Sequence, residues 1–211
     1  MKKVQHYKIL GGKDGLHACH GGSMVYKRGV WTKPTENVEP CARGYHTVTA
    51  PQLMAWLQNG TTIYHCDVRG AVDAGDKFVS RSIRLGRKVM DELSLRHLAC
   101  DFAAHVLHLF EEKHPQDARV RNCIATAREY ADGRASLDDL DAAWSAAESA
   151  ARSAAGSAAR SAARAVRSAV WSAAWSAAWS AAESAETKWQ QKRLALYLKG
   201  GKPWIDKPVK A

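Results

Sequence analysis

Residues 144–186 read WSAAESAARSAAGSAARSAARAVRSAVWSAAWSAAWSAAESAE, and this repeat decides the fold of the back half of the chain. Of these 43 residues, 19 are alanine and 10 are serine. Alanine is the strongest helix former, and the four-residue spacing places the remaining residues on one slowly drifting stripe. The pattern predicts a long Ala/Ser-rich helix. We expect it to begin at Leu137, because Ser136 and Asp139 have the form of a capping box.

The stripe of this helix carries arginines first and tryptophans later. Each four-residue step advances it by ~40°, and the three-residue step from Arg164 to Arg167 turns it back by about 60°. Three interpretations of this stripe stay open. It is buried in the core or in an oligomer interface, it binds a partner, or it lies on a membrane surface. The helix is expected either to bend at Gly156 or to continue through it as a straight rod. Glycine costs only about 1 kcal/mol relative to alanine in a helix, which is too little to decide between the two. The predicted partner-binding residues are Arg160, Arg164, Arg167, Trp171, Trp175 and Trp179.

Two further helices are expected upstream of the repeat. From Asp91, apolar residues recur at three- and four-residue spacing until His114-Pro115, which is typical of an amphipathic helix. A second helix from Asp117 should end at Asp132-Gly133 and pair antiparallel with the first. We therefore predict an all-α domain over residues 91–198, followed by a basic tail at 199–211.

The front of the chain has strand and turn patterns instead of helical ones. Residues 1–88 are predicted to form a small, mostly antiparallel α+β domain, which makes the fold class α+β. Lys27-Arg28-Gly29 is expected to be a hairpin turn with positive φ at the glycine, and Thr49 to cap a short helix. The strands are predicted at residues 4–10, 24–26, 30–32, 61–68 and 76–85, and the short helix at 51–57.

Composition limits the partners and the compartment. The chain of 211 residues has 31 Lys and Arg against 21 Asp and Glu, a net charge of +10, with basic ends and an acidic middle. This balance permits anionic ligands or nucleic acid without identifying them. The least charged stretch, residues 168–182, is shorter than the about 20 residues that cross a bilayer, so no transmembrane helix is expected, and a membrane is not among the predicted partners. Five cysteines and no export signal favour a reducing cytoplasm.

A candidate ligand site lies in the front domain. His20-Gly21-Gly22-Ser23 has the composition of a backbone nest for an anion, although the same residues also form an ordinary turn. The cysteines and histidines of this region lack closely spaced pairs, so we predict no metal site, no catalytic set and no cofactor. The residues predicted to bind an anionic, nucleotide-like ligand are His20, Arg28, Arg43, Tyr45 and His46.

The back half resembles a helical family of immunity proteins from bacterial toxin systems. The resemblance covers about residues 92–198 and implies a binding role with a protein partner. The motifs that carry it are Leu98-Ala99-Cys100-Asp101-Phe102-Ala103, Leu109-Phe110-Glu111, His114-Pro115 and Ala127-Arg128-Glu129-Tyr130-Ala131-Asp132-Gly133, followed by the alanine-rich repeat.

The front half is similar to an uncharacterised domain of phage and bacterial proteins. The resemblance rests on Cys41-Ala42-Arg43-Gly44-Tyr45-His46 and on the strand Thr62-Ile63-Tyr64. The same segment resembles the ADP-ribosyltransferase fold, which implies a pocket for NAD. That fold places a catalytic glutamate on a late strand, whereas residues 78–85 contain no acid, so a binding pocket without turnover is the expectation.

These resemblances imply a non-enzymatic binding protein of bacterial or phage origin. It would neutralise or sequester a protein partner or a small signalling ligand in a toxin or defence conflict, as an immunity or anti-defence protein. One alternative is a protein that binds NAD or ADP-ribose, as a degenerate transferase. Another is a nucleic-acid-binding protein, for which the basic ends are the evidence. A homo-oligomer is compatible with each of them.

Overall fold

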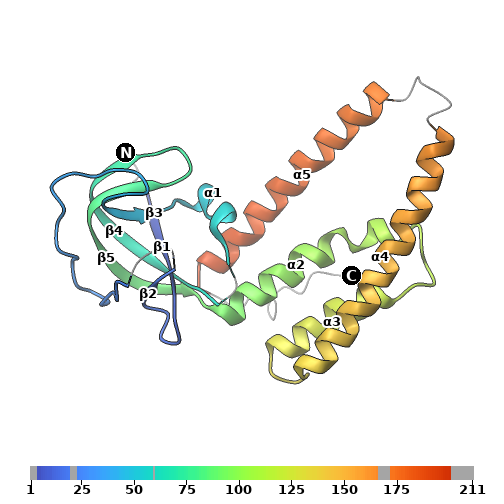
Figure 1. The fold of residues 1–211 in the computed structure, drawn as a ribbon, viewed down its shortest axis with the longest axis horizontal. Coiled ribbons are helices and arrows are strands. Elements are labelled where there is room, and N and C mark those ends of the chain that lie inside the picture. Colours follow the sequence, from blue (N-terminus) through green and yellow to red (C-terminus); the bar gives the residue numbers. More distant parts are fainter. Residues whose placement is uncertain (1–3, 20–22, 59, 166–171, 201–211) are drawn as a thin grey trace. The chain divides into compact units, whose positions relative to one another are not determined.

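The computed structural model describes residues 4–19, 23–58, 60–165 and 172–200, and of residues 153–184 it describes the backbone alone (Figure 1). The described residues up to Leu95, together with those from Arg193 onward, form one compact unit. Residues 96–192 form the second. The first unit is a sheet with a short helix and the second is helical, so the predicted α+β class is confirmed. The predicted domain boundaries at residues 88 and 91 stay predictions.

The first unit contains one antiparallel sheet of five strands in the order β2-β1-β4-β5-β3. Helix α1 and the 3-10 helix η1 connect β3 to β4. Thr49 and Gln52 form a capping box at α1, as the sequence predicts for Thr49. The elements are β1 (His6–Gly11), β2 (His17–Ala18), β3 (Tyr45–Thr47), α1 (Ala50–Leu53), η1 (Met54–Trp56), β4 (Thr62–Asp73) and β5 (Phe78–Met90).

The sheet closes on itself between β1 and the residue that follows β3. The Tyr7 N–H donates to the Val48 carbonyl at 2.8 Å, and the Val48 N–H donates back to the Tyr7 carbonyl at 3.0 Å. Residues just after β3 therefore pair with β1, and strands β1, β4, β5 and β3 form a closed ring. Side chains alternate across each strand, so every second residue points inside the ring. The buried cluster there consists of Leu10, Tyr26, Tyr64, Cys66, Ile83 and Leu85.

The hairpin predicted for residues 24–26 and 30–32 is wrong. The Tyr26 N–H donates to the Leu16 carbonyl, whereas the Thr32 N–H donates to the Ile83 carbonyl of β5. Each segment pairs with a different neighbour, because the long strand β5 offers an edge that a three-residue partner does not. The predicted backbone of Gly29 is correct, with φ at 75°.

The helices are α2 (Glu92–Glu111), α3 (Arg119–Ala131), α4 (Leu137–Ala165) and α5 (Ser172–Leu198). Side-chain pairs join α2 to α3 in opposite chain directions, which confirms the antiparallel arrangement. The predicted capping box is present at the start of α4, since the Asp139 N–H donates to Ser136 Oγ at 3.1 Å and the Ser136 N–H donates to Asp139 Oδ2 at 2.9 Å. Gly156 lies inside α4, and residues 166–171, between α4 and α5, are outside the described part.

All five cysteines are free thiols. Among the residues that the structure describes, no helix combines the length and the apolar character needed to cross a membrane.

Candidate functional sites

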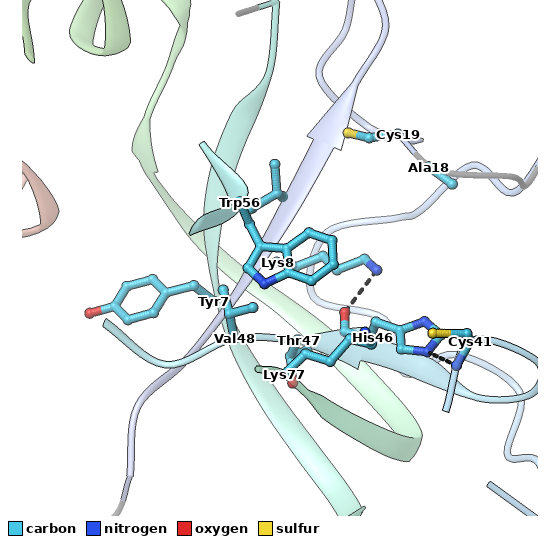
Figure 2. A pocket seen from close by; sticks show the side chains of 11 residues that line it. Tyr7, Lys8, Ala18, Cys19, Cys41, His46, Thr47, Val48, Trp56 and Lys77 are labelled. Carbon is cyan, nitrogen blue, oxygen red and sulfur yellow. Dashed lines mark hydrogen bonds between the residues drawn. The ribbon is translucent and has the colours of Figure 1, made fainter. Parts of the chain in front are cut away.

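A pocket of about 320 Å³ opens in the first unit, at the mouth of the closed sheet (Figure 2). Its walls are apolar at Ile9, Ala18 and Val48, and its polar groups come from β1, β3, the 3-10 helix η1 and loops between the strands. No aspartate or glutamate lines it among the described residues. The complete lining is Tyr7, Lys8, Ile9, Ala18, Cys19, Cys41, His46, Thr47, Val48, Trp56 and Lys77.

Lys8 is the charged residue at the centre of this pocket. It lies on the same face of β1 as His6 and Leu10, which are 6% and 0% exposed, so its side chain enters the ring of strands. Its ammonium donates to the His46 carbonyl at 2.8 Å and lies 5.3 Å from the centre of the Tyr26 ring. Burial lowers the pKa of Lys8 to about 8.

The titratable groups around Lys8 carry no negative charge near neutral pH. Burial raises the pKa of the Cys66 thiol to about 12 and that of the Tyr26 hydroxyl to about 12. The pKa of the Cys19 thiol is also raised by burial. Burial, and then the charges of Lys8 and Lys77, lower the pKa of His46, which is therefore neutral. Within the described part of the chain, no carboxylate forms an ion pair with Lys8.

Trp56 and Lys77 form the rim of the pocket. The Trp56 indole N–H donates to the Asp76 carbonyl at 3.1 Å, which fixes the ring, and the Lys77 ammonium lies 5.0 Å from the ring centre. Lys77 also binds both carboxylate oxygens of Asp76 at 3.2 Å. The hydrogen bond that Lys77 donates to the Asp76 carboxylate raises the pKa of Lys77. The charge of Lys77 is thus already balanced, in contrast to that of Lys8.

The turn before β3 places His46 in the pocket. Cys41 has a φ of 65°, and its N–H donates to His46 Nε2 at 3.1 Å. Gly44 has a φ of 119°, and a Cβ at this position would meet a Val79 methyl group at 2.7 Å. Only glycine fits there. The imidazole is consequently held as an acceptor at Nε2, which leaves Nδ1 as the protonated nitrogen.

The pocket brings together only one of the predicted ligand residues that the structure describes. His46 lines it. Tyr45 packs against the buried cluster instead, and its hydroxyl donates to the Lys33 carbonyl at 2.8 Å. Arg28 and Arg43 are exposed and are not part of the lining, and His20 lies outside the described residues. Reasoning from the sequence missed Lys8. The signal was the alternation of His6, Lys8 and Leu10 on one face of a predicted strand.

The helical unit buries charged groups in pairs. Asp101 is fully buried, and Arg128 donates to its carboxylate at 2.8 Å. His97 is 1% exposed, and its Nε2 lies 2.8 Å from an Asp132 oxygen. Burial alone would raise the pKa of Asp132, but the hydrogen bond and charge of His97, together with Arg134, bring that pKa below its usual value. These contacts fix α3 against α2.

One aromatic side chain of α5 packs on α2. The Trp189 ring is stacked on the His105 ring, with 3.6 Å between the ring centres. It meets the Phe102 ring edge to face, with 6.3 Å between the ring centres. His105 Nε2 also lies 3.3 Å from Glu186. The predicted partner-binding arc falls outside the side chains that the structure describes. Arg160 and Arg164 lie on α4, Trp175 and Trp179 lie on α5, and Arg167 and Trp171 are among the residues not described.

The first turns of α4 expose an apolar and acidic face. Trp144 is 61% exposed and Leu137 is 55% exposed, and the seven-residue spacing puts both on one side of the helix. Asp138 and Asp141 are exposed beside them. The opposite stripe, which ends at Ala150 with 1% exposure, is turned inward.

Residues 88–177 match the model of the family described as Imm-5 like putative immunity protein. The match covers α2, α3 and α4 and ends inside α5. It confirms the predicted resemblance for this region and indicates an immunity-type role with a protein partner. No curated protein and no solved structure matches the chain. The resemblances predicted for the front half stay predictions.

Proposed function

We propose that this protein is a non-enzymatic binding protein that neutralises a protein toxin in a bacterial or phage conflict. The observation that carries the proposal is the family match over residues 88–177, most of which belong to the helical unit. An immunity protein acts by occupying its partner, so a rigid surface is needed instead of a catalytic centre. The buried pairs between α2 and α3 provide that rigidity, since buried charges fix one arrangement of the helices.

The contact surface that we assign is the exposed face of α4. Large exposed aromatic residues are common anchors of protein interfaces, and Trp144 is 61% exposed. Asp138 and Asp141 surround it with negative charge, so the partner surface should be basic and should offer a pocket for an indole. The arc from Arg160 to Trp179 is the second proposed contact.

The test is a growth assay with the proteins encoded by the genes on either side of this one. Each is produced in a bacterial host with and without the chain, and the chain should restore growth for one of them. The variant Trp144→Ala with Asp141→Lys should lose this protection. Val72→Ala, an exposed position on β4, is the matched control and should keep it. Circular dichroism of each variant shows that the fold is intact.

Two outcomes would contradict the proposal. If the chain protects against none of these proteins, the neutralising role is wrong. If the double variant protects as well as the original chain, the role stands and the face of α4 is not the contact. For the arc, Trp171→Ala with Trp175→Ala should change the mass of the native assembly or the affinity for the toxin. Unchanged values of both would remove the arc from the interface.

A further inference from the structure

The pocket of the first unit holds a positive charge that the described protein groups do not neutralise. Lys8 projects from β1 into the ring of strands, and its ammonium is held by the His46 carbonyl at 2.8 Å and by the Tyr26 ring at 5.3 Å. A carbonyl and a ring face orient an ammonium group, but neither supplies a net negative charge. A half-buried lysine in this position costs stability unless an anion joins it.

Among the described residues, the neighbours of Lys8 supply no negatively charged partner. The Cys19, Cys66 and Tyr26 groups stay protonated at neutral pH because burial raises their pKa values. Lys77, the other cation of the pocket, is paired with Asp76 at the rim. Lys8 is thus the cation that remains available to a bound anion within the described lining.

The remaining walls suit a flat organic group. The volume of about 320 Å³ falls in the range of small-molecule sites, about 300–1,000 Å³. Ile9, Ala18 and Val48 make the walls apolar, and the Trp56 indole presents a ring that its hydrogen bond to Asp76 holds in place (Figure 2). Aromatic rings favour stacked or edge-to-face contact with other rings.

We propose that this pocket binds a small organic anion that carries one phosphate or carboxylate group on a flat ring system. The anionic group binds the Lys8 ammonium, and the ring packs against Trp56. The pocket belongs to the first unit, whereas the proposed toxin contact belongs to the second, so this binding activity goes beyond the proposed function. It includes no covalent step.

The test is calorimetric titration of the full chain with two matched pairs of probes. Adenosine 5′-monophosphate and adenosine differ in the phosphate. Indole-3-acetate and indole-3-acetamide differ in the carboxylate charge. We expect the charged member of one pair to bind saturably at millimolar concentration or below, and its neutral partner to bind about tenfold or more weakly.

Three variants locate the site. Lys8→Met removes the charge and keeps an unbranched side chain that is one atom shorter, and should weaken binding of the anion to the level of its neutral partner. Lys27→Met changes an exposed lysine of the same unit outside the pocket, and should leave binding unchanged. Trp56→Ala should weaken both members of the binding pair about equally, because it removes the ring contact and leaves the charge contact.

The titrations distinguish a phosphate ligand from a carboxylate ligand, and they also test whether the pocket binds an anion at all. Binding of the monophosphate that depends on Lys8 assigns a phosphate ligand, and binding of the acetate that depends on Lys8 assigns a carboxylate ligand. The proposal is overturned if neither anion binds at millimolar concentration, or if binding survives Lys8→Met. A failed fold does not explain a loss in Lys8→Met, because removal of an unpaired buried charge should raise its melting temperature.

Discussion

The two units differ in whether a buried charged side chain has a partner of opposite charge. In the helical unit, the fully buried carboxylate of Asp101 is matched by the Arg128 guanidinium at 2.8 Å, and the buried His97 by the Asp132 carboxylate at 2.8 Å. In the sheet unit, Lys8 meets a carbonyl, an aromatic ring and protonated thiols. A matched pair contributes to one fixed packing arrangement. An unmatched charge lowers stability and leaves a position that a ligand can fill.

The largest effect should come from breaking the buried pair between α2 and α3. Arg128→Ala leaves the fully buried Asp101 without this partner, and we expect a loss of about 3 kcal/mol in the free energy of unfolding. Urea denaturation followed by circular dichroism measures it. Arg121→Ala removes the exposed pair with Glu111 on the same two helices and should cost much less. Equal losses in the two variants would mean that burial does not set the value of these pairs.

The second largest effect should be an increase in the free energy of unfolding instead of a loss. Lys8→Met removes an unmatched charge from the interior, so we expect the free energy of unfolding to rise by about 1 kcal/mol at pH 7. Thermal melting of the two proteins in the same buffer compares them. Lys27→Met serves as the surface control and should leave the melting temperature unchanged. A clear loss of stability in Lys8→Met would show that Lys8 has a structural role and would remove the contrast between the units.

Alkaline pH should reduce the cost of Lys8 in the original chain. Its pKa is about 8 in the folded protein and 10.5 in its ordinary environment. Below pH 8 the lysine is charged in both states, and the full cost is present. Between pH 8 and 10.5 the unfolded chain binds more protons, so stability rises relative to Lys8→Met. The difference between the two proteins isolates Lys8 from Cys66 and Tyr26, whose raised pKa values act in the opposite direction. A difference that does not change over this range would contradict the lowered pKa.

The smallest expected effect is the loss, at acid pH, of the stability that the pair between His97 and Asp132 contributes. The pKa of Asp132 lies below its ordinary value of 3.8, so its stabilisation is present above that pH and is lost as the pH falls through the lowered pKa. Asp132→Asn should therefore be less stable than the original chain at pH 6, and the difference should shrink as the pH falls below 3.8. Melting curves over this range measure it, with Asp138→Asn as the exposed control. A constant difference between pH 6 and pH 2 would contradict the pair.

Local patterns were sufficient for α2, α3 and the beginning of α4, whereas the long helix expected from Leu137 is described as two helices, α4 and α5, on either side of residues 166–171. The repeat after Trp144 and the capping box of Ser136 and Asp139 use contacts within four residues, and α4 begins where they predict. The hairpin around Lys27 failed for the opposite reason. Its backbone pairs with segments elsewhere in the chain, including β5, and the amino acid types do not say which of several edges a short strand will join.

The residues of the candidate sites also divide into those that a local motif could predict and those that depend on distant contacts. His46 could be found from its motif, because Cys41 and Gly44 shape the turn that holds it. Arg28 and Arg43 were chosen for their charge, yet both are exposed and outside the pocket lining. Lys8 was overlooked because a lysine in a strand usually points to solvent. Only the closure of the sheet between Tyr7 and Val48 turned its side chain inward.

The sequence by itself determined the α+β class, the start of the alanine-rich helix α4 and the resemblance of residues 88–177 to immunity proteins. These depend on periodicity, capping and motif, which are local properties of the chain. The tertiary structure decided which charges are buried and which of them are matched. That choice depends on strand closure and on helix pairing between residues far apart in the chain, such as Asp101 with Arg128 and Lys8 with His46, and no local pattern records those contacts.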